Sequence, residues 1–185
     1  MNARDRQNAR AAALKKLPVG FGVYVLDDIY FEHLYVGKSV TSFKDRVSRH
    51  LTSARTDVIA NRTVDPSEIA RVRCYRVSDK ALVPRLENYL IHHFNDISPL
   101  MNGELPARTE SELGFELPEP FFVQVMSDEE RRYRMEPEFQ AKYMMSRMTE
   151  ALNYRVDVKL NDTTARTFNV LREKLNRALI SIDTI

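Results

Sequence analysis

The first hundred residues divide into segments that differ in how often apolar residues recur. In some segments the spacing is typical of a strand, and in others it is typical of a helix. Residues 19–27 and 30–37 are rich in β-branched and aromatic side chains, and a short polar link at Asp27 and Asp28 joins them. This pattern predicts two strands in an antiparallel hairpin. The segment "ARVRCYRV" at 70–77 alternates residue by residue, which predicts a third strand.

Other segments carry apolar residues at helical spacing. In residues 43–60 the apolar side chains of Phe43, Val47 and Leu51 lie on one helical face. The segment at residues 78–95 begins with a Ser-Asp cap and has Pro84 in its first turn, where proline is tolerated. The predicted helices, in chain order, cover residues 3–17, 43–60, 78–95, 137–152 and 162–183.

The chain changes character after Gly103. A connector with three prolines leads to "FFVQV", a short strand or buried segment, and "RVDVKL" at 155–160 is a candidate strand between the last two helices. We therefore expect an α/β protein of the α+β type: a small three-stranded antiparallel sheet flanked by helices, followed by a mainly helical part. The expected division is a domain at 1–104 and an accessory or dimerisation region at 105–185.

The final helix has an apolar stripe with two readings. The stripe recurs at spacings of three and four, over Phe168, Leu171, Leu175, Ala178 and Ile182. It can pack on its own domain, or it can form a two-heptad seam in a homodimer. Two heptads are fewer than the three or four that indicate a coiled coil, so packing on its own domain is the favoured reading.

Composition narrows the class of protein. The 185 residues have a net charge of only +2, but residues 1–104 carry +4 and the rest −2, so a polyanion would meet the first part more readily. With Cys74 as the single cysteine, neither an intrachain disulfide nor a cysteine-based zinc site can form. No apolar run approaches 18 residues, and the first residues lack the apolar stretch of a secretory signal. We expect a cytoplasmic protein that does not span a membrane.

The segment "HLYVGKSVTSFKDRVSRHL" at 33–51 raises the question of phosphate chemistry. It contains Gly-Lys-Ser, but a phosphate-binding P-loop needs a glycine five positions earlier, and that position is Glu32. A P-loop is therefore not expected. The strand is instead expected to break at Gly37, letting the backbone turn close to a substrate. His33, just before it, is expected to be a surface residue.

Six elements in order resemble the GIY-YIG nuclease superfamily over residues 20–103. "GVY" at 22–24 and "YVG" at 35–37 correspond to the two signatures, with valine in place of isoleucine, and their tyrosines are eleven residues apart. Arg46 follows at the motif position of the next helix, with His50 four residues later on the same face. Glu87 in "RLENYL" corresponds to the metal-binding glutamate of a later helix, and "PLMN" supplies the closing asparagine, Asn102.

The resemblance implies a divalent-metal-dependent nuclease with one metal. Glu87 would bind Mg²⁺ or Mn²⁺, and Arg46 would contact the scissile phosphate. Tyr24 or Tyr35 would activate the water, with Tyr24 ranked first and His50 accepting or orienting a proton. Such a tyrosine needs nearby cations, because its ordinary pKa is about 10. The expected substrate-binding residues are Gly37, Lys38, Arg49 and Asn102.

The expected function is a DNA endonuclease, used in restriction, defence or a mobile element. RNA remains open as a substrate. The alternative is a non-catalytic nucleic-acid-binding or scaffold protein on the same fold. That the residues at the motif positions are all present favours the enzyme.

Overall fold

The computed structural model describes residues 2–52, 64–103, 105–109, 113–153 and 162–184. Contacts within the chain group it into two compact units, Met1–Ser127 and Asp128–Ile185. The predicted division after residue 104 stays a prediction.

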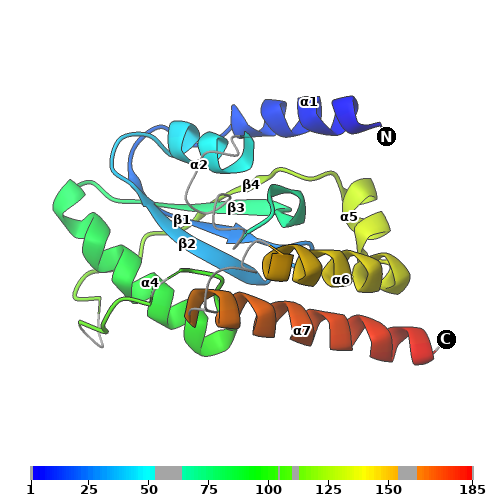
Figure 1. Cartoon of the computed structure of the whole chain (residues 1–185). Coiled ribbons are helices and arrows are strands. Elements are labelled where there is room, and N and C mark those ends of the chain that lie inside the picture. Colours follow the sequence, from blue (N-terminus) through cyan, green and yellow to red (C-terminus); the bar gives the residue numbers. More distant parts are fainter. Residues whose placement is uncertain (1, 53–63, 104, 110–112, 154–161, 185) are drawn as a thin grey trace. The chain divides into compact units, whose positions relative to one another are not determined.

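The first unit is built on an antiparallel sheet with the strand order β2-β1-β3-β4 (Figure 1). Its strands are β1 (Gly22–Asp27), β2 (His33–Ser39), β3 (Arg71–Arg76) and β4 (Phe121–Gln124). The predicted class, an antiparallel sheet with helices and a helical C-terminal region, is confirmed, but the sheet has four strands and not three. The additional strand is the segment "FFVQ", whose four residues are too few to establish an alternating pattern.

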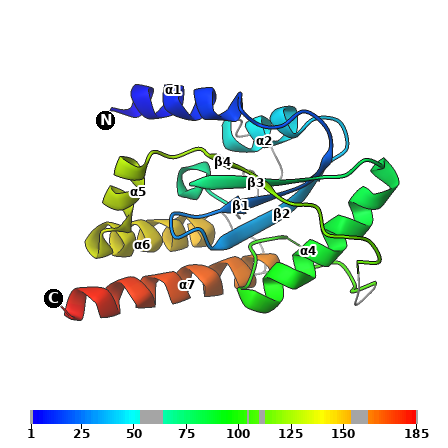
Figure 2. The ribbon, with the colours of Figure 1, turned by 180° about the vertical axis from the view of Figure 1, so that it is seen from behind.

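Helices cover the sheet on both faces (Figures 1 and 2). Helix α4 (Val83–Ile97), entered through the 3₁₀ turn η2 (Lys80–Leu82), packs on β1 and β2 from one side. The other face is covered by α1 (Ala3–Leu14) and α2 (Phe43–Thr52). Strand β1 is therefore buried along its whole length. Because side chains alternate along a strand, Val23 and Val25 enter the core beneath α4, whereas Tyr24 faces α2.

The expected break at Gly37 does not occur. Strand β2 continues through Lys38 to Ser39, and Gly37 is paired directly with Tyr24 of β1. The glycine is explained by packing across the strands and not by a turn. The predicted helix 43–60 is found from Phe43 to Thr52, and its remainder lies outside the described residues.

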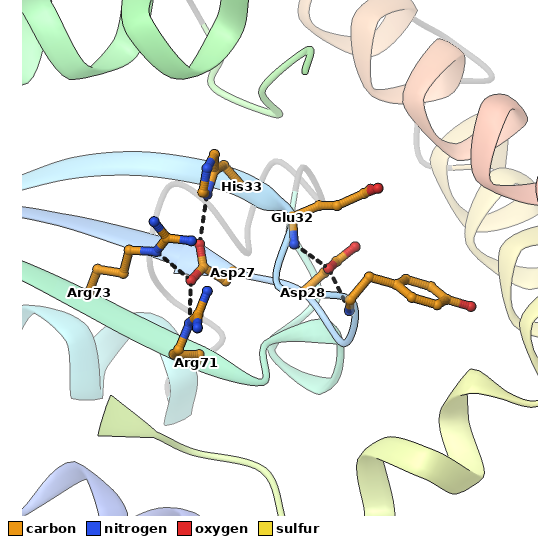
Figure 3. Close-up of polar contacts among 7 residues, drawn as sticks. Asp27, Asp28, Glu32, His33, Arg71 and Arg73 are labelled. Carbon is orange, nitrogen blue, oxygen red and sulfur yellow. Dashed lines mark hydrogen bonds and ion pairs between the residues drawn. The ribbon is translucent and has the colours of Figure 1, made fainter. Parts of the chain in front are cut away.

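The hairpin between β1 and β2 is not closed by a simple polar link, since Asp27 and Asp28 are both buried. Asp28 Oδ1 accepts hydrogen bonds from the backbone N–H groups of Tyr30 (2.8 Å) and Glu32 (3.0 Å), as Figure 3 shows. Between them Phe31 adopts a positive φ of 64°. The Asp28 carboxylate thus serves as the hydrogen-bond acceptor for two backbone N–H groups of this tight connection.

The second unit contains three described helices: α5 (Asp128–Met135), α6 (Pro137–Asn153) and α7 (Asp162–Asp183). Helices α6 and α7 pack against each other, and the α7 stripe lies inward, with Leu171 and Ala178 buried. This supports the reading that the stripe packs on its own unit. Helix α5 was not predicted, and the candidate strand 155–160 lies outside the described residues. None of the described helices combines the length and the apolar composition needed to cross a membrane.

Candidate active site

Three aromatic rings meet on the α2 side of the sheet, next to the edge strand β2. The ring centroids of Tyr24 and His50 are 5.8 Å apart, those of Tyr35 and His50 6.0 Å, and those of the two tyrosines 6.3 Å. Tyr24 and His50 are buried, whereas Tyr35 is partly exposed. The two signature tyrosines therefore share one site but differ in their access to water.

Gly37 allows Tyr24 to reach this site. A Cβ atom at position 37 would lie 2.5 Å from the Tyr24 hydroxyl oxygen and 2.8 Å from the Tyr35 ring. Real Cβ atoms essentially never approach so closely, so any larger residue would displace one of the phenols. The glycine of the second signature is thus required by the tyrosine of the first, its partner across the strands.

Helix α2 brings Arg46 to the same place. Arg46 lies one turn before the buried His50, so both project from neighbouring positions of the helix. The Arg46 guanidinium is close enough to the Tyr24 hydroxyl to lower the pKa of that phenol. Arg49 is different: it is exposed, and its Nε donates to the backbone oxygen of Asp45 at 3.3 Å. The structure therefore does not bring Arg49 into the cluster, and its role in substrate binding stays a prediction.

Glu87 approaches from α4, on the opposite side of β2. Its Oε2 is 2.7 Å from the Nζ of Lys38, and the Glu87 side chain keeps 19% of its surface exposed. The Glu87 charge contributes to raising the pKa of Tyr24, which places the carboxylate within electrostatic range of that phenol. The site thus lies at the edge of the sheet and receives side chains from both of its faces.

The Tyr24 phenol is strongly held in its neutral form. Burial raises the pKa of Tyr24 well above its ordinary value, negative charge on Tyr35 and Glu87 raises it further, and Arg46 opposes the shift. The hydroxyl lacks a hydrogen bond of ordinary geometry within the described residues, although Arg46 is near. The predicted field of cations therefore does not outweigh desolvation at Tyr24.

Asn102 fastens the closing turn to the edge of the sheet. Its Nδ2 donates to the backbone oxygen of Val36 at 2.8 Å, and the N–H of Val36 donates to its Oδ1 at 3.0 Å. Both atoms of this buried amide are thus engaged with β2, one residue before Gly37. The contact supports a role in holding the site together, and the predicted contact with substrate stays a prediction.

The chemistry of Glu87 fits a divalent metal. Its carboxylate is a hard oxygen ligand, it is partly exposed, and it already carries a cation, Lys38, at 2.7 Å. Among the described residues no three His, Cys, Asp or Glu side chains gather as a ligand set. Mg²⁺ commonly uses one or two carboxylates and keeps several waters, so a single glutamate is a sufficient protein ligand.

One charged cluster was missed by sequence reasoning. Asp27, Arg71 and Arg73 join across β1 and β3, and His33, expected at the surface, lies 2.9 Å from Asp27 with only 13% of its side chain exposed. The available signal was a pair of arginines at alternating positions of a strand, which places them on one face.

Comparison with known proteins identifies the fold of this part of the chain. Residues 20–101 match the family described as the GIY-YIG catalytic domain, whose members are phosphodiester-hydrolysing nucleases and typically use a divalent metal. The matched segment contains Tyr24, Tyr35, Arg46, His50 and Glu87, and the predicted resemblance is confirmed. No curated protein and no solved structure matches the chain.

Proposed function

We propose that this chain is a divalent-metal-dependent DNA endonuclease. Its residues 20–101 match the GIY-YIG catalytic domain, a family of phosphodiester-hydrolysing nucleases. The observation that carries the proposal is the convergence of Tyr24, Arg46 and Glu87, which come from a strand and two helices on opposite faces of the sheet. The nuclease family implies a nucleic-acid substrate, and the choice of DNA is part of the proposal.

In this proposal Arg46 and Lys38 hold the phosphate to be cut. Arg46 has a permanent charge and a planar set of N–H donors that suits two phosphate oxygens. Phosphodiester hydrolysis increases the charge on those oxygens in the transition state, so a fixed guanidinium stabilises it more than the ground state. Lys38, half-exposed on the adjoining strand, adds a second charge.

Glu87 would bind the metal, which supplies positive charge that polarises the phosphate and stabilises the leaving 3′ oxygen. The carboxylate is suited to this because it is a hard oxygen ligand whose side chain keeps 19% of its surface exposed. Mn²⁺ could replace Mg²⁺ at such an oxygen ligand.

We assign water activation to Tyr35 and not to Tyr24, which reverses the order expected from the sequence. Tyr35 is partly exposed and can meet a water molecule, whereas Tyr24 is buried and has a raised pKa. Negative charge on Tyr35 raises the pKa of Tyr24, so the two phenols do not ionise together. In this assignment Tyr24 stays protonated and donates a hydrogen bond, while His50 orients the two rings.

A role in restriction, defence or a mobile element belongs to the proposal as well. Such enzymes cut both strands of a duplex, which a homodimer can do with one site in each subunit. The described exposed apolar residues of α7, Leu179 and Ile180, are the surface on which we expect this contact.

The test is plasmid nicking by the full chain with Mg²⁺ and with EDTA. The native protein is expected to nick only with the metal, and Glu87→Gln is expected to lose nicking while binding DNA as the native protein does. Asp96→Asn is the matched control, because Asp96 is an exposed carboxylate on the same helix α4 that pairs with Arg108. Unaltered nicking by Glu87→Gln would remove Glu87 from the site, and binding without cleavage under any divalent metal would favour the scaffold alternative.

A further inference from the structure

A buried carboxylate organises two arginines on the face of the sheet that α4 covers in part. Asp27 is fully buried, and its Oδ2 accepts hydrogen bonds from the Nε atoms of Arg71 (2.7 Å) and Arg73 (2.8 Å), as Figure 3 shows. The other oxygen, Oδ1, lies 2.9 Å from His33 Nδ1. Three strands therefore contribute to one network, and both guanidinium groups are held in fixed positions.

The network carries more positive than negative charge. Two arginines share the single carboxylate of Asp27, and within the described part of the chain no other carboxylate pairs with either. The Arg71 side chain keeps 21% of its surface exposed. Its Nε is the atom bound to Asp27, so its terminal nitrogens remain as donors for a ligand that approaches from solvent.

An exposed aromatic ring lies beside both guanidinium groups. Phe122 of the edge strand β4 is 49% exposed, and the centre of its ring is 5.1 Å from the Arg71 guanidinium carbon and 5.5 Å from that of Arg73. The Arg71 guanidinium carbon also lies 4.0 Å from the ring centre of Phe31. An exposed ring flanked by oriented cations is the combination with which proteins hold single-stranded nucleic acid, because the ring stacks on a base and the cations meet the backbone.

We propose that Arg71, Arg73 and Phe122 form a second contact site for nucleic acid, where an unpaired base stacks on Phe122 and its phosphate accepts hydrogen bonds from Arg71. This rests on the proposed function, in that the substrate is a nucleic acid, and it specifies the substrate class: a strand with unpaired nucleotides next to the duplex. Tyr24 of β1 pairs with Cys74 of β3, which pairs with Phe121 of β4. The backbones of Phe121 and Tyr24 are therefore two strand spacings apart, about 10 Å. Phe122, the next residue, faces the opposite side of the sheet, so the second site takes a flanking segment and not the bond that is cut.

The experiment measures binding of labelled single-stranded and duplex oligonucleotides, DNA and RNA, by fluorescence anisotropy. All variants are made in the full chain carrying Glu87→Gln, so that cleavage does not remove the probe. Phe122→Ala is expected to weaken single-strand binding by about tenfold or more and to leave blunt duplex binding unchanged. Arg71→Gln is expected to reduce the slope of log Kd against log salt by about 0.7, the value for one phosphate on a single strand.

Phe121→Ala is the matched control. Phe121 is the neighbouring residue of the same type, 48% exposed, but it points to the other face of β4, away from the arginines. Its replacement is expected to leave single-strand affinity unchanged. Phe122→Ala leaves the ion pairs of Asp27 in place, and thermal unfolding of both variants checks that they fold equally well.

The outcomes separate this site from the proposed nuclease function. If the native protein cuts DNA but Phe122→Ala binds single strands as tightly as Phe121→Ala does, the second site is refuted and the nuclease stands. Equal losses on duplex and single strand would refute stacking on an unpaired base. If the chain neither binds nor cuts any of these nucleic acids, the proposed function fails and the second site fails with it.

Discussion

The Tyr24 phenol lies over Gly37, its partner across the β1–β2 ladder, and a methyl group at position 37 would come within 2.5 Å of the Tyr24 hydroxyl oxygen. The two signature motifs therefore depend on each other through one contact. The "YVG" motif needs its glycine because the "GVY" motif sends its tyrosine across the neighbouring strand.

Gly37→Ala is expected to lower the cleavage rate by about a hundredfold, since displacing a catalytic group by roughly 1 Å can cost that much. Alanine is compatible with a strand, so the fold should persist, while crowding against the buried Tyr24 ring should lower the thermal midpoint by several degrees. Single-turnover cleavage and circular dichroism measure the two quantities. In a Tyr24→Phe background the same change should cost less, because part of the crowded group has been removed. Native turnover by Gly37→Ala would contradict the packing described here.

Tyr35→Phe is expected to reduce cleavage by about a hundredfold or more, as removal of a general base does, whereas Tyr24→Phe should have a smaller effect. The pKa of Tyr24 is raised well above 10, so its ionisation cannot shape the rate below pH 10. Any inflection in the rate below that pH should therefore persist in Tyr24→Phe. Cleavage rates measured from pH 6 to pH 10 test this, and an inflection that disappears only in Tyr24→Phe would return the base role to Tyr24.

Arg46→Ala is expected to lower kcat by about a hundred- to a thousandfold, which is typical when a transition-state hydrogen-bond donor is removed. Arg46→Lys keeps the charge but loses the planar fork of donors, so it should restore only part of the rate. Arg49→Ala is the matched control, because Arg49 is exposed on the same helix and bonds to Asp45. If Arg49→Ala reduces kcat as much as Arg46→Ala does, the assignment of the phosphate contact to Arg46 is wrong.

Cys74 is expected to be unreactive toward thiol reagents in the folded protein. Burial raises the pKa of this thiol to about 12, and the thiolate is the reactive form. A folded pKa above the unfolded value means that the thiol contributes stability at neutral pH, and that this contribution falls as the pH rises from about 9 toward 12. A chromogenic disulfide reagent at pH 8 should label one thiol per chain in the denatured protein and none in the folded protein. Rapid labelling of the native chain would show that position 74 is accessible.

The sequence predicted local order well and long-range geometry poorly. The hairpin, the order of the motif residues and the α4 helix with Pro84 in its first turn could be read from short segments. The β4 segment was predicted only as a short strand or buried segment, because four residues carry too little periodicity, and its pairing with β3 across some fifty positions was not predicted. The resemblance to a family assigned Glu87 to the site, but its contact with Lys38, 49 residues away, was not predicted.

Charge was the other property that local patterns did not determine. A tyrosine that activates water was expected to have nearby cations that favour its ionised form, but the pKa of Tyr24 depends mainly on how completely the folded chain excludes water from it. Likewise the sequence pattern predicted Asp27 in a polar turn. Only the pairing of β1 with β3 shows that this buried carboxylate forms ion pairs with Arg71 and Arg73. Solvent exclusion and strand register are both products of the whole fold.

The Asn102 amide also determines how this sheet meets other molecules. Strand β2 lies at the border of the sheet, where unsatisfied main-chain groups could recruit a strand from a second chain. At Val36 the outward N–H and carbonyl are already bonded to Asn102, and the outward carbonyl of Leu34 receives the N–H of Met101 at 2.7 Å. The turn therefore blocks the addition of another strand along residues 34–36 of this border.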